Sequence, residues 1–237
     1  MIRVATYNIL HASLKGLDAI ASVLAGIDAD LIGLQEVDQG VERSGGAWQA
    51  AELADRLGFH HTFAAACPWE SGLYGVAVLS RFPILGRETT ALPSRAILPL
   101  GDGAEPRILV EAEIELPAGL VDGATALTFA VTHLGLDPTE RRLQADAIAS
   151  RLHRRPRTLL CGDFNEGRTE PAYAKLSASL TDCVADAGGG LVRSYPSHRP
   201  TIGIDHVLRS GDLPPASRAW AVPTEASDHL PVVVDLG

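Results

Sequence analysis

The sequence predicts an α/β fold in which buried strands alternate with amphipathic helices. Short apolar runs suited to buried strands recur along the chain, for example at residues 31–35 and 159–161. Between such runs, as at residues 17–24, apolar residues recur with the spacing of one helix face. The 237 residues, 46% of them hydrophobic, suffice for one substantial core, and they contain no internal repeat or convincing linker. We therefore expect a single domain over residues 1–237.

The first part of the chain predicts a βαβ-like unit. A strand at residues 2–7 precedes Asn8, the helix at residues 17–24 follows, and a second strand at residues 31–35 ends at Glu36. Because Asn8 and Glu36 follow strands at comparable positions, both are candidate site residues.

The middle of the chain predicts a second helix and four strands. Apolar spacing indicates a helix at residues 50–57, and Gly58 suits the left-handed position that ends one. Strand patterns follow at residues 61–65, 75–80, 107–116 and 124–132. Turn-forming residues between the last two strands indicate a hairpin, whose second strand ends at His133.

A third helix is predicted to begin at Asp137, which suits the N-cap position before Pro138 and Glu140. Its buried face is expected to consist of Leu143, Ala147, Ile148 and Leu152. Basic residues between positions 151 and 157 lie where this helix should end, and a favourable interaction with the helix dipole accounts for them.

The central strand after this helix ends in Gly162, Asp163 and Asn165. Ligands of layered α/β folds bind at such strand ends. If the backbone stays extended, residues i and i+2 face the same way, so a carboxylate and an amide would point at one position. The alternative is a turn in which both side chains only cap loop backbone.

The last quarter of the chain predicts a short helix at residues 171–179 and closing strands at 204–208 and 232–236. Between them, residues 185–200 contain three consecutive glycines and are expected to form a flexible lip of a cleft. An Asp-His pair accompanies each closing strand, at residues 205–206 and 228–229.

Composition restricts the partners of the protein. A net charge of −9 counts against broad binding to nucleic acid, which needs Lys and Arg at the phosphates, although carboxylates clustered on a metal ion would explain part of the charge. The start of the chain has no signal-peptide pattern and no apolar stretch is long enough to span a bilayer, so we expect a cytoplasmic protein. We also expect a monomer. The three cysteines lack metal-ligand spacing and are expected to be buried.

The polar residues at the predicted strand ends have the chemistry of a site for a hard cation. They are Asn8, Glu36, His133, Asp163, Asn165, Asp205, Asp228 and His229. Carboxylate and amide ligands with few histidines suit Mg²⁺ or Mn²⁺, whereas Zn²⁺ prefers a nitrogen and sulfur cage. The set therefore points to chemistry on phosphates.

Seven short motifs, in order, resemble the endonuclease/exonuclease/phosphatase superfamily, which includes deoxyribonuclease I, apurinic endonucleases, neutral sphingomyelinases and inositol polyphosphate 5-phosphatases. The motifs are Ala5-Thr6-Tyr7-Asn8, Leu34-Gln35-Glu36-Val37, Gly75-Val76-Ala77-Val78-Leu79-Ser80-Arg81, Thr132-His133-Leu134, Gly162-Asp163-Phe164-Asn165, Ile204-Asp205-His206-Val207 and Ser227-Asp228-His229-Leu230-Pro231. The resemblance implies a four-layer α/β sandwich of two packed mixed β-sheets flanked by helices. It also implies a metal-dependent phosphoesterase.

The resemblance assigns roles to the metal and water sites first. Glu36 would be the main metal ligand, with Asn8 beside it and Asp228 contributing to the metal environment. Asp163 would orient or deprotonate the attacking water, and Asn165 would donate to a phosphoryl oxygen.

Histidines take the remaining roles that the resemblance implies. His229, oriented by Asp205, would stabilise the transition state or protonate the leaving group, and His133 would bind phosphate. Arg107 matches a phosphate-contacting arginine more loosely, the alternative being a surface residue at a strand end. Tyr74 either lines the cleft or packs in the core, which we favour.

Leu10 departs from the pattern, because apurinic endonucleases carry an acidic residue there. This difference weakens a role in DNA repair. Without a visible basic groove, we expect a small, lipid-type or inositol-type phosphoester as substrate, and a nuclease is the alternative.

Three other functions fit the sequence less well. A serine hydrolase built on Ser227, Asp228 and His229 fails because adjacent residues cannot converge in a relay and no nucleophile elbow is present. A zinc hydrolase fails because His60 and His61 have no partner at ligand spacing, and these are expected to be exposed loop residues. A non-catalytic binding protein on the same fold should have lost a ligand or base, whereas the whole set is present.

Overall fold

The computed structural model describes residues 1–94 and 105–237, which form two packed six-stranded sheets. The strands of the first sheet are β1 (Ile2–Asn8), β2 (Leu31–Gln39), β3 (His60–Trp69), β4 (Gly72–Ser80), β11 (Ala216–Ala221) and β12 (Val232–Leu236). Those of the second are β5 (Ile84–Ala91), β6 (Ile108–Glu115), β7 (Ala126–His133), β8 (Thr158–Asp163), β9 (Thr181–Asp182) and β10 (Asp205–Arg209). The strand orders are β11-β12-β1-β2-β4-β3 and β5-β6-β7-β8-β10-β9.

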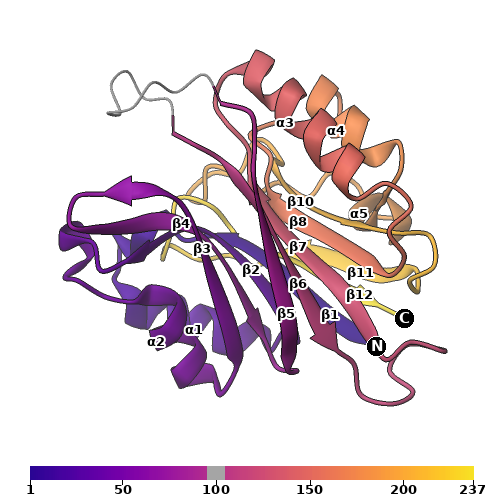
Figure 1. Ribbon diagram of the computed structural model, residues 1–237, viewed down its shortest axis with the longest axis horizontal. Coiled ribbons are helices and arrows are strands. Elements are labelled where there is room, and N and C mark those ends of the chain that lie inside the picture. The colour runs from indigo at the N-terminus through magenta and orange to yellow at the C-terminus, as the bar shows by residue number, and fades with distance from the viewer. Residues whose placement is uncertain (95–104) are drawn as a thin grey trace.

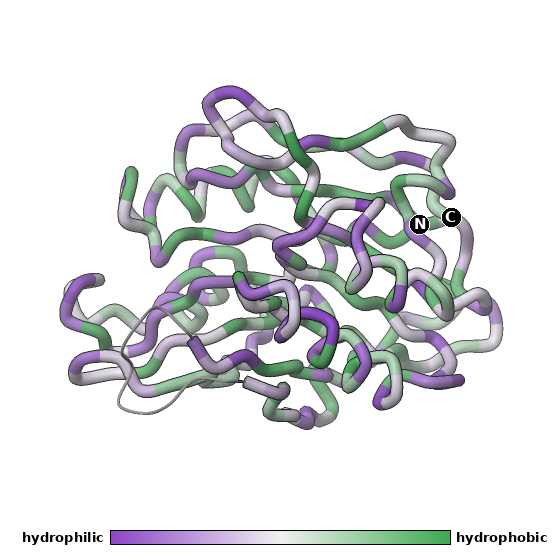
Figure 2. The backbone as a smooth tube through the Cα atoms, turned by 90° about the horizontal axis from the view of Figure 1, so that it is seen from above, coloured by the Kyte–Doolittle hydropathy of each residue, from purple (hydrophilic) through white to green (hydrophobic). Residues whose placement is uncertain are grey.

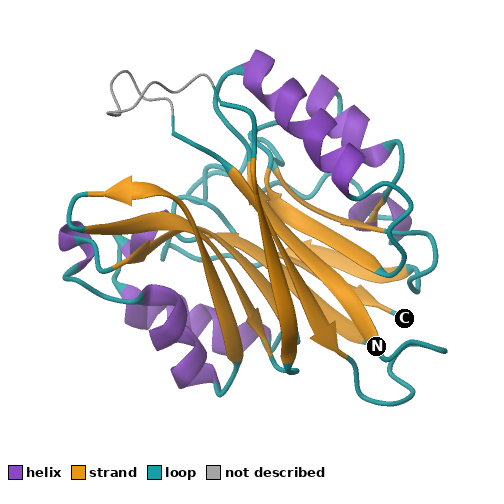
Figure 3. Cartoon of the chain, viewed as in Figure 1, coloured by secondary structure: helices purple, strands orange, loops and turns teal. Residues whose placement is uncertain are grey.

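Five helices and two short 3₁₀ turns are present among the described residues. They are α1 (Leu17–Ile27), α2 (Gln49–Leu57), α3 (Pro138–Arg151), α4 (Pro171–Ser177) and α5 (Cys183–Asp186), with the short 3₁₀ turns η1 (Leu10–Ala12) and η2 (Glu42–Ser44). Helices α1 and α2 lie on the first sheet, and α3 and α4 lie on the second (Figure 1). Figure 3 shows the strands as the inner layers between these helices. The predicted four-layer α/β sandwich is confirmed.

The main hydrophobic core lies between the two sheets and includes Val4, Phe129 and Val234. Seen from above, hydrophobic stretches alternate with hydrophilic ones along the chain (Figure 2). The sheets lie close together at Gly33 of β2, where an added Cβ would lie 2.4 Å from the Cys161 sulfur in β8. A side chain at position 33 would therefore push the sheets apart.

Each sheet contains one pair of neighbouring parallel strands. Strands β1 and β2 are parallel and joined through α1, as the sequence predicts, and β7 and β8 are parallel and joined through α3. Helix α3 begins at the predicted cap, since Asp137 Oδ1 accepts the backbone N–H groups of Thr139 (2.8 Å) and Glu140 (3.0 Å). Gly58 likewise adopts the left-handed conformation that ends α2.

The predicted buried face of α3 is wrong in part, because Leu143 is 47% exposed. The helix instead buries a largely polar face: Glu140, Arg141, Gln144, Ala145 and Ile148. Arg141 donates to the carbonyls of Gly135 (3.2 Å) and Leu136 (2.6 Å) and pairs with Glu166 (2.8 Å). The polar face is buried because it holds the loop that precedes the helix.

Strands β5, β9 and β11 are not foreseen by the sequence, and β5 is mostly exposed, so it lacks an apolar run. His60 and His61 are exposed as expected, but they lie in β3 and not in a loop. The three cysteines are buried, which confirms that prediction. No helix in the described ranges is long and apolar enough to cross a membrane.

Candidate active site

The ends of adjacent strands bring the predicted site residues together. His133 of β7 is the register partner of Asp163 of β8, which in turn pairs with Asp205 of β10, so the three residues form one row. Gly162 permits this close pairing, because a Cβ there would lie 2.0 Å from the Thr132 carbonyl oxygen. The first sheet contributes the facing residues.

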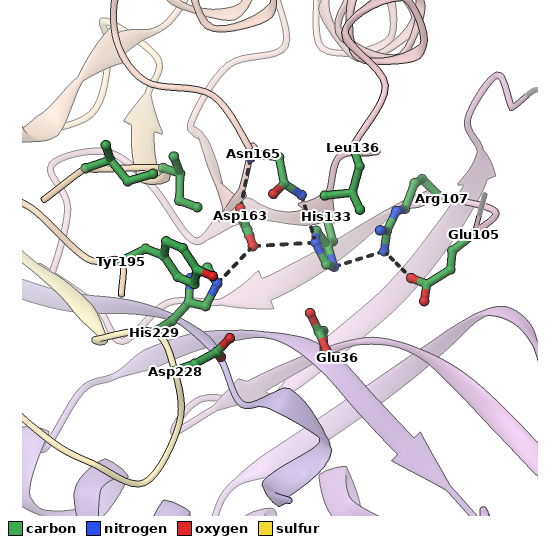
Figure 4. A pocket seen from close by; sticks show the side chains of 12 residues that line it. Glu36, Glu105, Arg107, His133, Leu136, Asp163, Asn165, Tyr195, Asp228 and His229 are labelled. Atoms are coloured by element: carbon green, nitrogen blue, oxygen red, sulfur yellow. Dashed lines mark hydrogen bonds and ion pairs between the residues drawn. The ribbon is translucent and has the colours of Figure 1, made fainter. Parts of the chain in front are cut away.

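A cleft of about 340 Å³ opens at this end of the sandwich (Figure 4). It is lined by Glu36, Glu105, Arg107, His133, Leu136, Asp163, Asn165, Tyr195, Ile202, Ile204, Asp228 and His229. The predicted residues Asn8 and Asp205 lie just behind this lining. Each hydrogen-bonds a residue that faces the cleft.

Glu36 reaches the cleft through a β-bulge. The register between β2 and β4 shifts between Leu34 and Val37, and Glu36 adopts a left-handed φ of 56°. Asn8 Nδ2 donates to Glu36 Oε1 at 2.9 Å. Burial raises the pKa of Glu36, and the nearby carboxylates add to this effect. The arrangement favours a cation beside Glu36.

Asp163 lies at the centre of the site. Its Oδ1 accepts the backbone N–H of Asn165 (2.9 Å), and its Oδ2 accepts from Asn8 Nδ2 (3.1 Å). The same Oδ2 is 3.5 Å from His133 Nε2 and 3.6 Å from His229 Nε2. Burial, reinforced by the Asp205 charge, raises the pKa of Asp163 to about 7. A carboxylate with this pKa is suited to accept a proton near neutral pH.

Asn165 is not in the extended conformation, because its φ is +51°. The turn alternative therefore describes the backbone correctly, with Asp163 capping the Asn165 N–H. The Asn165 side chain nevertheless faces the cleft, donating to the Leu134 carbonyl (2.9 Å) and lying 3.2 Å from His133 Nε2.

His229 is held by Asp205, whose Oδ2 lies 2.9 Å from His229 Nδ1. The ring also packs on Tyr195, with centroids 4.8 Å apart. Burial lowers the pKa of His229, but the charge and hydrogen bond of Asp205 outweigh it and raise the pKa to about 10. His229 thus presents a protonated Nε2 to the cleft. Ser227 is buried and donates to the Asn8 carbonyl (2.8 Å), so it does not act as a serine nucleophile paired with His229.

His133, in contrast, is neutral. Burial, together with the charges of Arg107 and His229, lowers its pKa well below the usual value. Arg107 Nη1 lies 3.0 Å from His133 Nδ1, and since arginine only donates, Nδ1 accepts and Nε2 carries the proton. The same Nη1 is 3.0 Å from Glu105 Oε2. Arg107 is buried, so the surface alternative is wrong.

Sequence reasoning missed Glu105, Leu136, Tyr195 and Ile202, and it placed Ile204 in a strand and a motif without assigning it to the lining. No residue pattern marks Glu105, which precedes a strand, and Leu136, Tyr195 and Ile202 lie outside the named helices and strands, where hydrophobic periodicity gives no signal. Tyr74, in contrast, is buried as expected and packs near Trp69.

The family model described as "Endonuclease/Exonuclease/phosphatase family" matches residues 5–229. The chain belongs to this family.

Several proteins resemble this family member. The uncharacterized protein YbhP of Escherichia coli K12 is 28% identical over 193 residues, which cover 78% of this chain and 71% of YbhP. A functionally unknown conserved protein from Enterococcus faecalis has a similar fold, with a TM-score of 0.79, 18% identity and coverage of 100% and 99% of the two chains. A Bacteroides thetaiotaomicron mannosyl-6-phosphatase gives a TM-score of 0.74 at 17% identity, with both chains covered fully. At these identities the structural matches establish the fold alone.

Two groups of residues in the described part of this family member offer metal ligands. Oxygen and nitrogen atoms of Asp163, Asp205 and His229 lie within 4.8 Å of one another, but His229 and Asp205 are already hydrogen-bonded to each other. Glu36 and Asp228 lie across the cleft from Asp163 (Figure 4). The second group offers oxygen atoms without breaking the His229–Asp205 pair.

Proposed function

We propose that this family member is a divalent-metal-dependent phosphoesterase. It hydrolyses a phosphodiester or phosphomonoester through metal-assisted attack of water, on a small, lipid-type or inositol-type substrate. The observation that supports this most is the placement of Asp163 between His133 and His229 and opposite Glu36 in one cleft (Figure 4). The family includes hydrolytic phosphoesterases and nucleases.

The donor set fits a hard cation. Glu36 and Asp228 would hold Mg²⁺ or Mn²⁺, which prefer oxygen ligands, and Asn8 would complete the site beside Glu36, whose Oε1 accepts from Asn8 Nδ2. The raised pKa of Glu36 shows that burial and neighbouring carboxylates disfavour its charge, and a bound cation would relieve this cost. When bound, such an ion supplies positive charge close to the phosphoryl oxygens.

The protein's own residues move the protons. Asp163 Oδ2 accepts a proton from the water whose oxygen bonds to phosphorus. As the phosphorus–oxygen ester bond breaks, the leaving oxygen takes a proton from His229 Nε2. The proton on Asp163 can then return to His229, because Oδ2 and Nε2 are 3.6 Å apart. Neutral His133 and Arg107 donate hydrogen bonds toward the phosphoryl oxygens.

The test is hydrolysis of bis(p-nitrophenyl) phosphate by protein treated with chelator and then supplied with Mg²⁺ or Mn²⁺. We expect chelation to abolish turnover and either ion to restore it. Full activity in excess chelator, with no metal bound, would overturn the proposal. A parallel screen of inositol phosphates, phospholipids, DNA and RNA separates the proposed substrates from the nuclease alternative. The expected monomer can be checked by light scattering.

A further inference from the structure

We propose that the cleft selects a phosphodiester monoanion whose ester group is apolar, and that Glu105, Leu136 and Ile202 determine this specificity. The inference rests on the proposed phosphoesterase function and narrows its substrate class. It is supported by two independent features of the lining, a neutralised arginine and an exposed apolar wall.

The first feature limits the charge of the substrate. Arg107 is the only arginine or lysine among the described residues that line the cleft. Its Nη1 is paired at 3.0 Å with Glu105 Oε2, and the Glu105 side chain remains 26% exposed. Arg107 thus offers hydrogen-bond donors with little net positive charge. A second negative charge on the phosphate would approach the Glu105 carboxylate and be repelled.

The charged residues of the lining also disfavour a substrate with more than one negative charge. Among the described residues that line the cleft, four carboxyl groups face a single arginine, Arg107: they belong to Glu36, Glu105, Asp163 and Asp228. The described lining residues thus offer no cluster of cationic side chains to a polyanion. Nucleic acids and polyphosphorylated inositols, which bind through clusters of cationic side chains, are therefore disfavoured.

The second feature is an apolar wall beside the phosphate position. Leu136 is 69% exposed and Ile202 is 46% exposed, yet both line the cleft, together with Tyr195 and Ile204. Large apolar side chains that are exposed and gathered at a cleft mark a surface that a ligand covers. Figure 4 shows Leu136 next to His133 and Asn165. An apolar group esterified to the phosphate would lie against this wall.

The wall is held in place before any ligand binds. Arg141 donates to the carbonyls of Gly135 and Leu136, which fixes the loop that carries Leu136. Ile202 and Tyr195 exchange two backbone hydrogen bonds of 3.1 Å. Because these loops are already ordered by the fold, covering them costs little conformational entropy.

The apolar part is tested with methyl and hexyl p-nitrophenyl phosphate, which share one leaving group. We expect kcat/KM to be roughly tenfold higher for the hexyl ester, since each fully buried methylene contributes up to about fourfold and this cleft is open. Leu136→Ser and Ile202→Ser should each lower the hexyl-to-methyl ratio. Leu143→Ser, an exposed leucine of α3 outside the lining, is the matched control and should leave the ratio unchanged.

A binding measurement separates recognition from turnover. Hexyl methylphosphonate, a monoanion that lacks the leaving group, should inhibit the wild type more strongly than ethyl methylphosphonate does. In Leu136→Ser the two compounds should inhibit equally. Equal inhibition of the wild type by both compounds would overturn the proposal that the apolar wall binds the ester group.

The charge part compares p-nitrophenyl phosphate, a dianion, with the methyl p-nitrophenyl diester. Glu105→Gln should raise the monoester-to-diester ratio of kcat/KM by roughly tenfold, because removing the carboxylate charge frees Arg107. Glu113→Gln, an exposed glutamate of β6, is the control.

The outcomes are distinct. An unchanged ratio in Glu105→Gln, or a loss of metal affinity without a change in the ratio, would overturn the specificity role of Glu105. Hydrolysis of none of these esters with added metal would instead overturn the proposed function.

Discussion

Replacing Asp205 with asparagine isolates the effect of one buried charge. Asp205 Oδ2 lies 2.9 Å from His229 Nδ1, and the amide oxygen of Asp205→Asn can still accept that hydrogen bond. Burial of the ring, which lowers the pKa of His229, is unchanged, but the main opposing charge is lost. We therefore expect the pKa of His229 to fall from about 10 toward its ordinary value.

The expected fall in the pKa of His229 is judged from the wild-type protein, in which this pKa is raised from the ordinary 6.5 to about 10. Carboxylates of Asp163 and Asp228 also favour the protonated ring and remain in the variant. A fall of at least two pKa units is expected, or roughly 3 kcal/mol in the free energy of protonation. A fall of two units would leave His229, the proposed general acid, mostly protonated at pH 7, so turnover should decrease mainly at alkaline pH, where its alkaline limit should be lower than in the wild type.

The pH dependence of the unfolding free energy gives a second measure of the effect of Asp205 on His229. Because folding raises the pKa of His229, its protonation stabilises the fold fully below about pH 6.5, and this contribution is lost as the pH rises through about 10. The difference in unfolding free energy between wild type and Asp205→Asn should therefore shrink between those pH values. Urea unfolding in chelator at several pH values measures it.

The direct assay is a nuclear magnetic resonance titration of the histidine rings in metal-free protein. Asp212→Asn, which removes a carboxylate that accepts the Arg157 N–H, is the control and should leave His229 unchanged. If His229 in Asp205→Asn still titrates within one unit of the wild type, Asp205 is not the cause of its raised pKa.

Three further predictions test the metal site, the catalytic unit and the packing. Glu36→Gln should weaken Mn²⁺ binding at least tenfold in calorimetry and lower turnover with it; unchanged binding would contradict the assignment. Asp163→Asn and His229→Ala should each lower turnover by roughly three or more orders of magnitude, and the double variant should fall well short of the product of the two losses, whereas His60→Ala should remain close to wild type in the same assay. Gly33→Ala should lower the unfolding free energy by about 1–3 kcal/mol in urea, because its Cβ would meet the facing sheet; unchanged unfolding would show that the sheets can adjust.

The strand ends were predictable because local patterns mark them. Buried runs in β1 and β8 end at Asn8 and Asp163, and the hydrophobic-to-polar change is visible without the fold. Motif order then placed His133 and His229 in the same site, and the register of neighbouring strands agrees for His133.

Features that depend on long-range contacts were not predictable in the same way. Leu143 fits the helical periodicity of α3, yet it is exposed because Arg141 occupies the buried face to hold the preceding loop. Glu105 lies at the site through its pairing with Arg107, a contact that no spacing in the sequence reveals. Asn165 follows its strand in a left-handed conformation, which a local pattern does not distinguish from an extended one.

The bulge in β2 shows how a one-residue deletion during evolution would change the cleft. Leu34 and Val37 pair with Ala77 and Gly75, so two residues of β2 lie opposite a single residue of β4. Deleting one residue there would restore a regular ladder and withdraw Glu36 from the cleft. If Glu36 holds the metal ion as proposed, one short deletion would remove the activity while the sheets stay intact, so relatives with the same fold need not share the chemistry.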